Sequence, residues 1–227
     1  MRIVTLLISA VFFSGCKLII NATVYTSDIV SVFETHEPKL TPIEIQFEQS
    51  STNNCNENSG QLLAALAKHY ETVEFLGCYD ADFDTFARFR IVAEIVYEAV
   101  NKLSDSTDPI YIGVFEDGEQ ADTDITVAIF KNGETLKTLW DNVSGTFPIA
   151  SSRTPEITIT ATIANDSGHI ESLHVADVFA NGVPVVEETN LDVAHRNQID
   201  ILLSNVTNSA FATKSFFAVL AKLVHSS

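Results

Sequence analysis

The sequence predicts an α+β protein in which a small α+β unit is followed by an antiparallel β-sandwich-like half. Three observations support this prediction. Hydrophobic residues make up 46% of the 227 residues and include 15 Phe, so the chain has ample apolar surface to bury in a core. One stretch of the first half has apolar residues at helical spacing. The second half consists of short strand-like runs separated by Gly-containing turns.

In the first half, a helix is predicted over residues 59–70. Asn58 and Gln61 have the form of a capping box, which closes the start of a helix. Apolar side chains then follow at helical spacing, namely Leu62, Leu63, Leu66, Ala67 and Tyr70. Residues 27–33 fit either a helical turn or a strand, and we favour the helix. Strands are expected at residues 21–25, 43–48, 73–78 and 86–100.

In the second half, strands are predicted at residues 110–115, 125–130, 134–140, 157–163, 173–179 and 198–203. Turns lie between them at Asp117-Gly118, Asn132-Gly133, Ser167-Gly168 and Asn181-Gly182, and Asn-Gly is the strongest short hairpin signal. The last run, residues 211–224, fits both periods. We predict a strand there, with an amphipathic helix as the alternative. Short strands at this spacing favour an antiparallel sandwich.

A domain boundary is predicted after residue 104. Residues 101–108 (NKLSDSTD) are polar and charged and precede Pro109, as is typical of a linker. The predicted organisation is therefore a signal peptide over residues 1–15, an α+β domain with one disulfide over residues 16–104, and a β-rich domain over residues 105–227.

The charge of the chain restricts its partners. Acidic residues outnumber basic ones 30 to 13, which gives a formal net charge of -17. Such a surface repels nucleic-acid phosphates and anionic lipid headgroups. We therefore expect no nucleic-acid binding and no membrane docking through a basic patch. The simplest consequence of the acidity is solubility.

The N-terminus has the pattern of a signal peptide. Arg2 supplies a positive charge, and residues 3–13 (IVTLLISAVFF) form an apolar run. A bilayer span needs about 20 apolar residues, so this run is too short to cross a membrane. It has the length of the hydrophobic region of a secretory signal.

The segment Phe13-Ser14-Gly15-Cys16 resembles the lipobox of bacterial lipoproteins. This resemblance implies cleavage before Cys16 and lipid on the Cys16 thiol, although Phe13 replaces the family's usual Leu. Lys17 stands where Asp would imply retention in the inner membrane, so the resemblance implies the periplasmic face of the outer membrane. The alternative is an ordinary cleaved signal with an incidental Cys. We regard the four N-x-Ser/Thr sequons, at Asn21, Asn142, Asn165 and Asn205, as coincidental in such a protein.

Two cysteines remain, and we predict that Cys55 and Cys78 form a disulfide. An even number of cysteines in an exported, oxidising compartment favours this outcome. A metal site is the rival interpretation. It is disfavoured because no Cys-x-x-Cys occurs and the nearest histidine, His69, lies on the predicted helix.

Two acidic stretches invite a calcium interpretation. Asp80, Asp82 and Asp84 alternate like calcium ligands, but Thr85 and Ile91 stand where an EF-hand loop needs Gly and Glu. A solvated turn is the better interpretation. The second stretch resembles an exposed hairpin loop and contains Glu116, Asp117, Glu119, Asp122 and Asp124. We predict no metal site.

The sequence contains no recognisable catalytic or cofactor motif. The histidines are scattered, at His36, His69, His169, His174, His195 and His225. No Gly-x-Ser-x-Gly, His-Glu-x-x-His, Ser-x-x-Lys or phosphate-binding Gly-rich loop occurs. We therefore predict no catalytic residue and no small-molecule cofactor. A site assembled from residues far apart in sequence would leave no such motif.

Several segments look similar to uncharacterised lipoproteins of phages and prophages of Gram-negative bacteria. They are the lipobox, Cys55, residues 73–78 (VEFLGC), residues 82–89 (DFDTFARF) and residues 202–206 (LLSNV). The resemblance implies a context but assigns no catalytic residue. The first functional hypothesis is a membrane-anchored module that binds or masks another envelope protein. The second is an envelope hydrolase with a non-motif active site.

Overall fold

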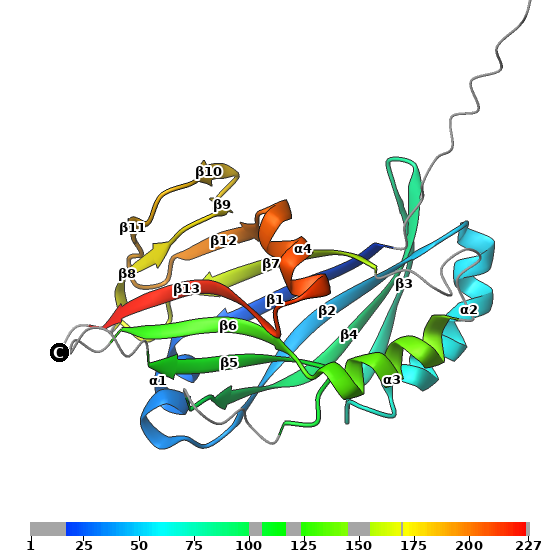
Figure 1. Cartoon of the computed structure of the whole chain (residues 1–227), viewed down its shortest axis with the longest axis horizontal. Helices are drawn as coiled ribbons and strands as arrows, with labels where there is room; N and C mark the ends of the chain where they lie inside the picture. Colours follow the sequence, from blue (N-terminus) through cyan, green and yellow to red (C-terminus); the bar gives the residue numbers. More distant parts are fainter. Residues whose placement is uncertain (1–16, 100–105, 117–123, 145–154, 169, 226–227) are drawn as a thin grey trace, which may run out of the picture.

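The first strands of the protein have alternating buried and more exposed side chains, as the sequence predicts. The computed structural model describes residues 17–99, 106–116, 124–144, 155–168 and 170–225 (Figure 1). In β1 (Lys17–Tyr25) every second side chain is buried. β1 pairs antiparallel with β2 (Lys39–Gln49), and β2 pairs along its whole length with β4 (Asp84–Tyr97).

The other strands continue this sheet on both sides. They are β3 (Val73–Ala81), β5 (Ile110–Glu116), β6 (Ile125–Lys131), β7 (Glu156–Ala164), β8 (Ile170–Val175), β9 (Val178–Ala180), β10 (Val183–Val185), β11 (Thr189–Asp192), β12 (Gln198–Leu203) and β13 (Phe217–His225). All thirteen strands of the described residues lie in one sheet. Its order is β10-β9-β12-β7-β1-β2-β4-β5-β6-β13-β8-β11, and β3 pairs with β4 beside this path.

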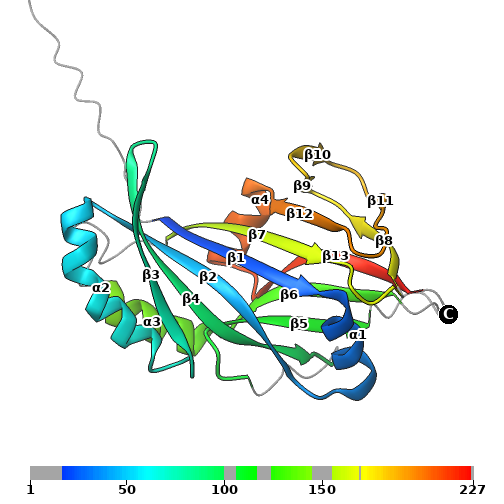
Figure 2. The same cartoon turned by 180° about the vertical axis from the view of Figure 1, so that it is seen from behind.

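One bent segment of chain connects the two sides of the sheet. β8 pairs with β13, whereas β9, which starts three residues after β8 ends, pairs with β12. Asp177, between them, has a φ of 54°, a left-handed conformation that turns the chain. Since β12 and β13 lie on opposite sides of the strand order, the β8–β9 segment bridges them. The sheet is therefore strongly curved and nearly closed (Figure 1, Figure 2).

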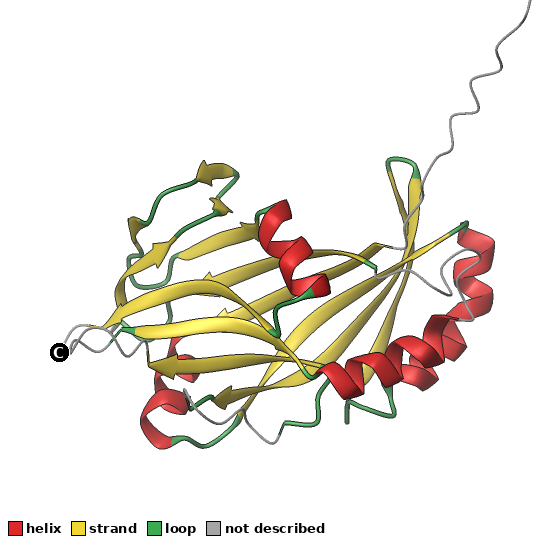
Figure 3. Ribbon diagram, in the orientation of Figure 1, coloured by secondary structure: helices red, strands yellow, loops and turns green. Residues whose placement is uncertain are grey.

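The predicted fold class, an α+β unit followed by a sandwich-like half, is wrong because the protein is mainly β. Strands from both halves of the chain join the same sheet: β1 pairs parallel with β7, and β4 pairs parallel with β5. A sandwich needs two sheets that face each other. Here one curved sheet wraps its inner face around one large core. The helices lie at the margins of the sheet (Figure 3). Alternation predicts which face of a strand is buried, but not which strand it pairs with.

The sheet and the core continue past the predicted domain boundary at residue 104. Residues 100–105 lie outside the described residues. On either side of them, Ile95 of β4 lies beside Ile112 of β5. The hydroxyl of Tyr70 accepts a hydrogen bond from Ile110 N (3.1 Å) and donates one to Ile110 O (3.4 Å). The described parts of residues 16–104 and 105–227 thus share one sheet and one hydrophobic core.

Asp108 lies next to this contact and is 9% exposed. Its burial raises the pKa of the carboxyl from 3.8 to about 6, against the lowering effect of the hydrogen bond that its Oδ2 accepts from Glu94 N (3.0 Å). The nearby Glu94 and Glu71 carboxylates raise the pKa further. The folded protein therefore keeps Asp108 protonated up to a higher pH than the unfolded chain does.

We predict that Asp108 makes the protein less stable as pH rises from about 4 to about 6. In this interval the folded state binds more protons than the unfolded state, so the free energy of unfolding falls with pH, by up to roughly 3 kcal/mol for a shift of two pKa units. Asp108→Asn keeps an acceptor for Glu94 N and cannot ionise. Denaturant unfolding at pH 4 and pH 7 should show the variant gaining stability over the wild type only at pH 7. Asp192→Asn, at an exposed carboxylate, should follow the wild type, and parallel pH curves for all three proteins would contradict the prediction.

The helix before β3 begins earlier than predicted. α2 (Thr52–Leu66) is capped by Ser51, whose side chain accepts a hydrogen bond from Asn54 N (3.3 Å). Asn58, the predicted cap, lies within the helix, where its side chain donates to Gln49 Oε1 (3.0 Å). The first turns of α2 are polar because they face solvent. In the sequence, such a polar stretch cannot be told apart from a loop.

The segment predicted as a strand at residues 134–140 is a helix. Asn132 caps α3 (Gly133–Val143) by accepting hydrogen bonds from Glu134 N and Thr135 N. Side chains at helical spacing then meet the core, namely Leu136, Leu139, Trp140 and Val143. Asn132-Gly133 predicts a hairpin turn, but the same Asn is a favoured helix cap.

The other two helices close the ends of the sheet. α1 (Thr26–Thr35) confirms the helix favoured at residues 27–33 and buries Ile29 and Val32. α4 (Asn205–Thr213) is capped by Ser204 and packs against β7 and β13. The run 211–224 fits both periods because it contains a junction: α4 ends at Thr213 and β13 begins at Phe217.

Candidate functional site

The first end of the sheet lies beside the predicted lipidation residue. Cys16 is outside the described residues, but Lys17, the next residue, begins β1. Lys17 N donates to Glu48 Oε2 (2.8 Å), and Lys17 Nζ forms an ion pair with Asp84. The hydrogen bond to Asp84 raises the pKa of the Lys17 ammonium despite partial burial, which favours the charged form of Lys17. We call this region, Lys17 with Glu48 and the β3–β4 turn, the proximal end.

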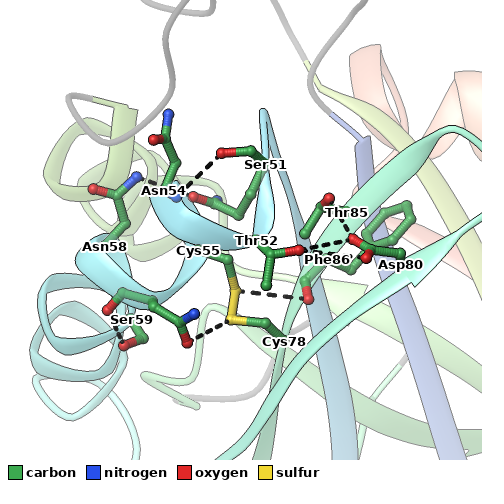
Figure 4. The surroundings of a disulfide bond; sticks show 12 residues. Ser51, Thr52, Asn54, Cys55, Asn58, Ser59, Cys78, Asp80, Thr85 and Phe86 are labelled. Atoms are coloured by element: carbon green, nitrogen blue, oxygen red, sulfur yellow. Dashed lines mark hydrogen bonds between the residues drawn. A yellow bond between two sulfur atoms is a disulfide. The ribbon is translucent and has the colours of Figure 1, made fainter.

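The predicted disulfide joins Cys55 of α2 to Cys78 of β3 next to the proximal end (Figure 4). Their Cα atoms are 6.1 Å apart, which is within the usual range for a disulfide. Cys55 is fully buried, and its sulfur lies 3.8 Å from the carbonyl oxygen of Phe86 in β4. The prediction of this pairing is confirmed, and the bond fastens α2 to the β3–β4 hairpin.

The three alternating aspartates of the β3–β4 turn serve local structure. Asp80 accepts hydrogen bonds from the hydroxyls of Thr52 (3.1 Å) and Thr85 (2.7 Å), as Figure 4 shows. Asp84 pairs with Lys17, and Asp82 has a φ of 53° in the turn itself. In the described segments no group of three or more His, Cys, Asp or Glu side chains could hold a metal ion. Most of the second acidic stretch, residues 117–123, lies outside them.

A groove of about 780 Å³ opens at the other end of the sheet, and we call it the distal groove. Gln198 of β12, in its wall, pairs with Ala164, and Ala164 pairs with Tyr25 at the far end of β1 from Lys17. β1 has nine residues, so roughly 27 Å of strand separates Lys17 from this level. The walls come from β9 to β12 and the loop before β12.

The lining of the distal groove combines apolar side chains with several side-chain amides. The apolar lining residues are Ala180, Val183, Val185, Leu191, Val193 and Ile199. Asn181 is structural, since its Oδ1 accepts from Asp200 N (3.0 Å). The exposed side chains of Asn190, Asn197 and Gln198 form no hydrogen bond within the described residues, so solvent or a ligand can use them. Small-molecule sites have this combination of apolar lining and a few polar groups.

Two charged residues also line the distal groove. Asp192 and Arg196 lie on opposite sides of Val193 in the chain, and both are exposed. Arg196 forms no salt bridge with any residue that the structure describes. The chain has 30 acidic and only 13 basic residues, so Arg196 is one of few cations on this surface. It can bind a carboxylate of a ligand in a bidentate manner.

A buried asparagine holds the chain segments behind the distal groove together. Asn165 is 1% exposed, and its Nδ2 donates to Ile170 O (2.8 Å) and Val193 O (2.6 Å). Its Oδ1 accepts from the Thr26 hydroxyl (3.1 Å) at the start of α1. The side chain thus ties the end of β7 to the start of β8, to the residue after β11 and to α1. This burial also supports the interpretation of the Asn165 sequon as coincidental.

Asp166, the next residue, fastens the start of α1. Its Oδ1 accepts from Ser27 N (2.9 Å) and its Oδ2 from the Ser27 hydroxyl (2.7 Å). Burial by itself would raise the pKa of Asp166, but the hydrogen bonds from Ser27 and Thr26 outweigh it and lower the pKa. A carboxylate at a helix N-terminus is stabilised in this way.

The described histidines do not gather in the distal groove. His174 Nδ1 lies 3.7 Å from Glu188 Oε1, and neither residue lines the groove. His36 stacks on Tyr97 with ring centroids 3.8 Å apart. Burial lowers the pKa of His69, which follows α2. The sequence contained one signal for the groove, the Asn181-Gly182 turn between β9 and β10, but the turn identifies a hairpin and not a cavity.

Comparison with known proteins identifies the family. Residues 19–224 match a family described as a domain of unknown function, DUF7424. The chain belongs to this family. The DUF7424 match begins in β1 and ends in β13, so it includes every residue of the distal groove, and Cys16 precedes it.

The remaining comparisons found no further relative. No curated protein and no solved structure matches the chain. None of the helices in the described segments has the length and hydrophobicity that a transmembrane span requires.

Proposed function

We propose that this DUF7424 protein is a lipoprotein of the bacterial cell envelope that binds a segment of another envelope protein in its distal groove. In this proposal the chain is cut before Cys16, and lipid on Cys16 holds it at the outer membrane, facing the periplasm. The observation that carries the proposal is the position of the groove, at the far end of β1 from Lys17.

The arrangement of the two ends supports a tethered binding module. Lys17 is already part of β1, so lipid on Cys16 would hold the proximal end close to the membrane without a linker. The distal groove would then open roughly 27 Å along the strand direction from the anchor. At that distance another envelope protein can reach it.

The lining of the distal groove suits a polypeptide segment. Its apolar lining residues can receive alternate side chains of an extended segment. The amides of Asn190, Asn197 and Gln198 can bond to peptide N–H and C=O groups. Arg196 adds a site for an acidic side chain of the partner. A groove of about 780 Å³ is within the usual range for small-molecule pockets, so it can hold a few side chains of such a segment.

Masking of an envelope receptor is the form of binding that the likeness to phage and prophage lipoproteins suggests. Lipid attachment concentrates the protein at the membrane. A groove with low affinity for its partner can therefore still be occupied there. Attachment through two or more acyl chains is effectively stable, whereas one chain is marginal.

The test combines the anchor with the groove. We expect expression in a Gram-negative host to reduce adsorption of at least one phage in a panel, and the receptor of that phage to co-purify with the protein. Val183→Asp should abolish both effects, because Val183 lines the groove and is 63% exposed. Val206→Asp on α4, at an 81% exposed position outside the groove, should abolish neither.

Intact mass from membranes gives the control for the anchor. The wild type should carry acyl chains on a chain that starts at Cys16, and Cys16→Ser should lose them together with the adsorption effect. Unchanged adsorption for every phage, with no envelope protein recovered, would refute the binding proposal. An unlipidated chain would refute the anchor.

A further inference from the structure

We infer that the β3–β4 hairpin is a second membrane contact, in which the ring of Phe83 inserts into the interface of a zwitterionic phospholipid bilayer beside the anchor. This inference rests on the proposed lipidation of Cys16. It assigns a function to the most exposed large apolar side chain of the described residues, because Phe83 has a relative exposure of 102%.

The position of Phe83 calls for an explanation. It lies in the two-residue turn between β3 and β4, where Asp82 already has the left-handed conformation. Turn positions favour small and polar residues such as Gly, Asn and Asp. Phe83 takes no part in either hydrophobic cluster of the described core. A bulky ring at this tip thus adds nothing to folding, whereas an aromatic ring is well suited to a membrane interface.

The hairpin tip lies close to the proposed anchor. Asp84 follows Phe83 directly and forms an ion pair with Lys17, which follows Cys16 directly. The ion pair therefore holds the hairpin tip close to Lys17, the residue that follows the proposed anchor. The hairpin also projects past β1 and β2 at this end of the sheet (Figure 1, Figure 2). A membrane that holds Cys16 would be the surface nearest to the tip.

Three contacts hold the strands of the hairpin in place next to its turn. The disulfide from Cys78 to Cys55 fastens β3 to α2. Asp80 accepts hydrogen bonds from Thr52 of α2 and Thr85 of β4. These contacts fix β3 and β4 just below the turn, so the ring of Phe83 already lies beside the anchor before the protein contacts a membrane. No further conformational entropy of the hairpin is then lost on contact.

Charge selects the kind of lipid. Asp84 is paired with Lys17 and Asp80 is bonded to two threonines, but Asp82 is exposed beside Phe83. The whole chain has a net charge of -17. Anionic headgroups would repel this surface, so the contact is to a zwitterionic bilayer.

A single tryptophan at the tip tests the inference. Trp140 is the only Trp of the chain, so Trp140→Phe combined with Phe83→Trp gives a probe at position 83 alone. Lipidated protein in phosphatidylcholine vesicles should show a blue-shifted emission compared with its Cys16→Ser form in solution. Bromine on the acyl chains should quench most of this emission. Vesicles rich in phosphatidylglycerol should give a smaller shift and weaker quenching.

The matched control is Val206→Trp in the same Trp140→Phe background, which should show neither the shift nor the quenching. If the lipidated protein floats with the vesicles but the probe at position 83 stays red-shifted and unquenched, the inference is overturned and the anchor stands. If Cys16 carries no lipid, the anchor proposal fails separately. A hexahistidine tag placed before Lys17 on nickel-chelating lipids then repeats the measurement, and an unquenched probe there overturns the inference as well.

Discussion

Replacing Asn165 with alanine should lower the free energy of unfolding by roughly 3 to 5 kcal/mol. The change leaves the carbonyls of Ile170 and Val193 without their donor, in a place where Asn165 is 1% exposed. Each buried polar group left without a partner costs about 1 to 3 kcal/mol, and the bond from Thr26 is also lost. Denaturant unfolding at equilibrium measures the loss.

The same substitution should loosen the closing segment more than the rest of the sheet. Asn165 bonds next to β8 and β11, whereas β2 and β4 are paired independently of it. Hydrogen exchange under native conditions should therefore rise first at β8 to β11. Asn205→Ala, at an exposed sequon on α4, is the control and should stay within about 0.5 kcal/mol of the wild type. Equal effects at both positions would show that Asn165 has no special structural role.

Removing the Cys55–Cys78 disulfide should cost about 3 kcal/mol. The two cysteines are 23 residues apart, and closing a loop of this size restricts the unfolded chain by about that amount on the chain-entropy account. We expect the double variant Cys55→Ala/Cys78→Ala to unfold at a lower denaturant concentration. The β3–β4 hairpin should be the first region to lose protection, since the bond holds it to α2.

Reduction provides the matched control for the disulfide. Dithiothreitol should bring the wild type close to the stability of the double variant and should leave the double variant itself unchanged. A wild type whose stability does not respond to reduction would contradict the prediction. If the prediction holds, the protein is most stable in an oxidising compartment, which agrees with the proposed export of the chain.

Most strands and their buried faces could be predicted from the sequence, because a strand repeats every two residues whatever its partners are. Residues 43–48 and 157–163 lie in β2 and β7 as expected. The errors arose where one signal has two structural meanings. Asn132-Gly133 fits a hairpin turn and a helix cap, and the polar residues 50–60 fit a loop and the exposed start of α2.

The predicted strand at residues 173–179 shows that local alternation does not identify a strand's partners. The structure divides it at Asp177 into the end of β8 and the start of β9, which pair with opposite sides of the sheet. Nothing in the local alternation signals this exchange of partners. It depends on β12 and β13 being brought near each other by all the strands between them.

By itself, the sequence determined the pairing of its two described cysteines, the alternation of most strands, and the absence of any recognisable catalytic motif. These features depend on residue type and on spacing along the chain. Only the tertiary structure decided that both halves form one nearly closed sheet, that Asn165 bridges its closing segment, and that the distal groove lies far from Lys17. Each of these depends on strand partners remote in sequence, and partner choice follows from the packing of the whole core rather than from local periodicity.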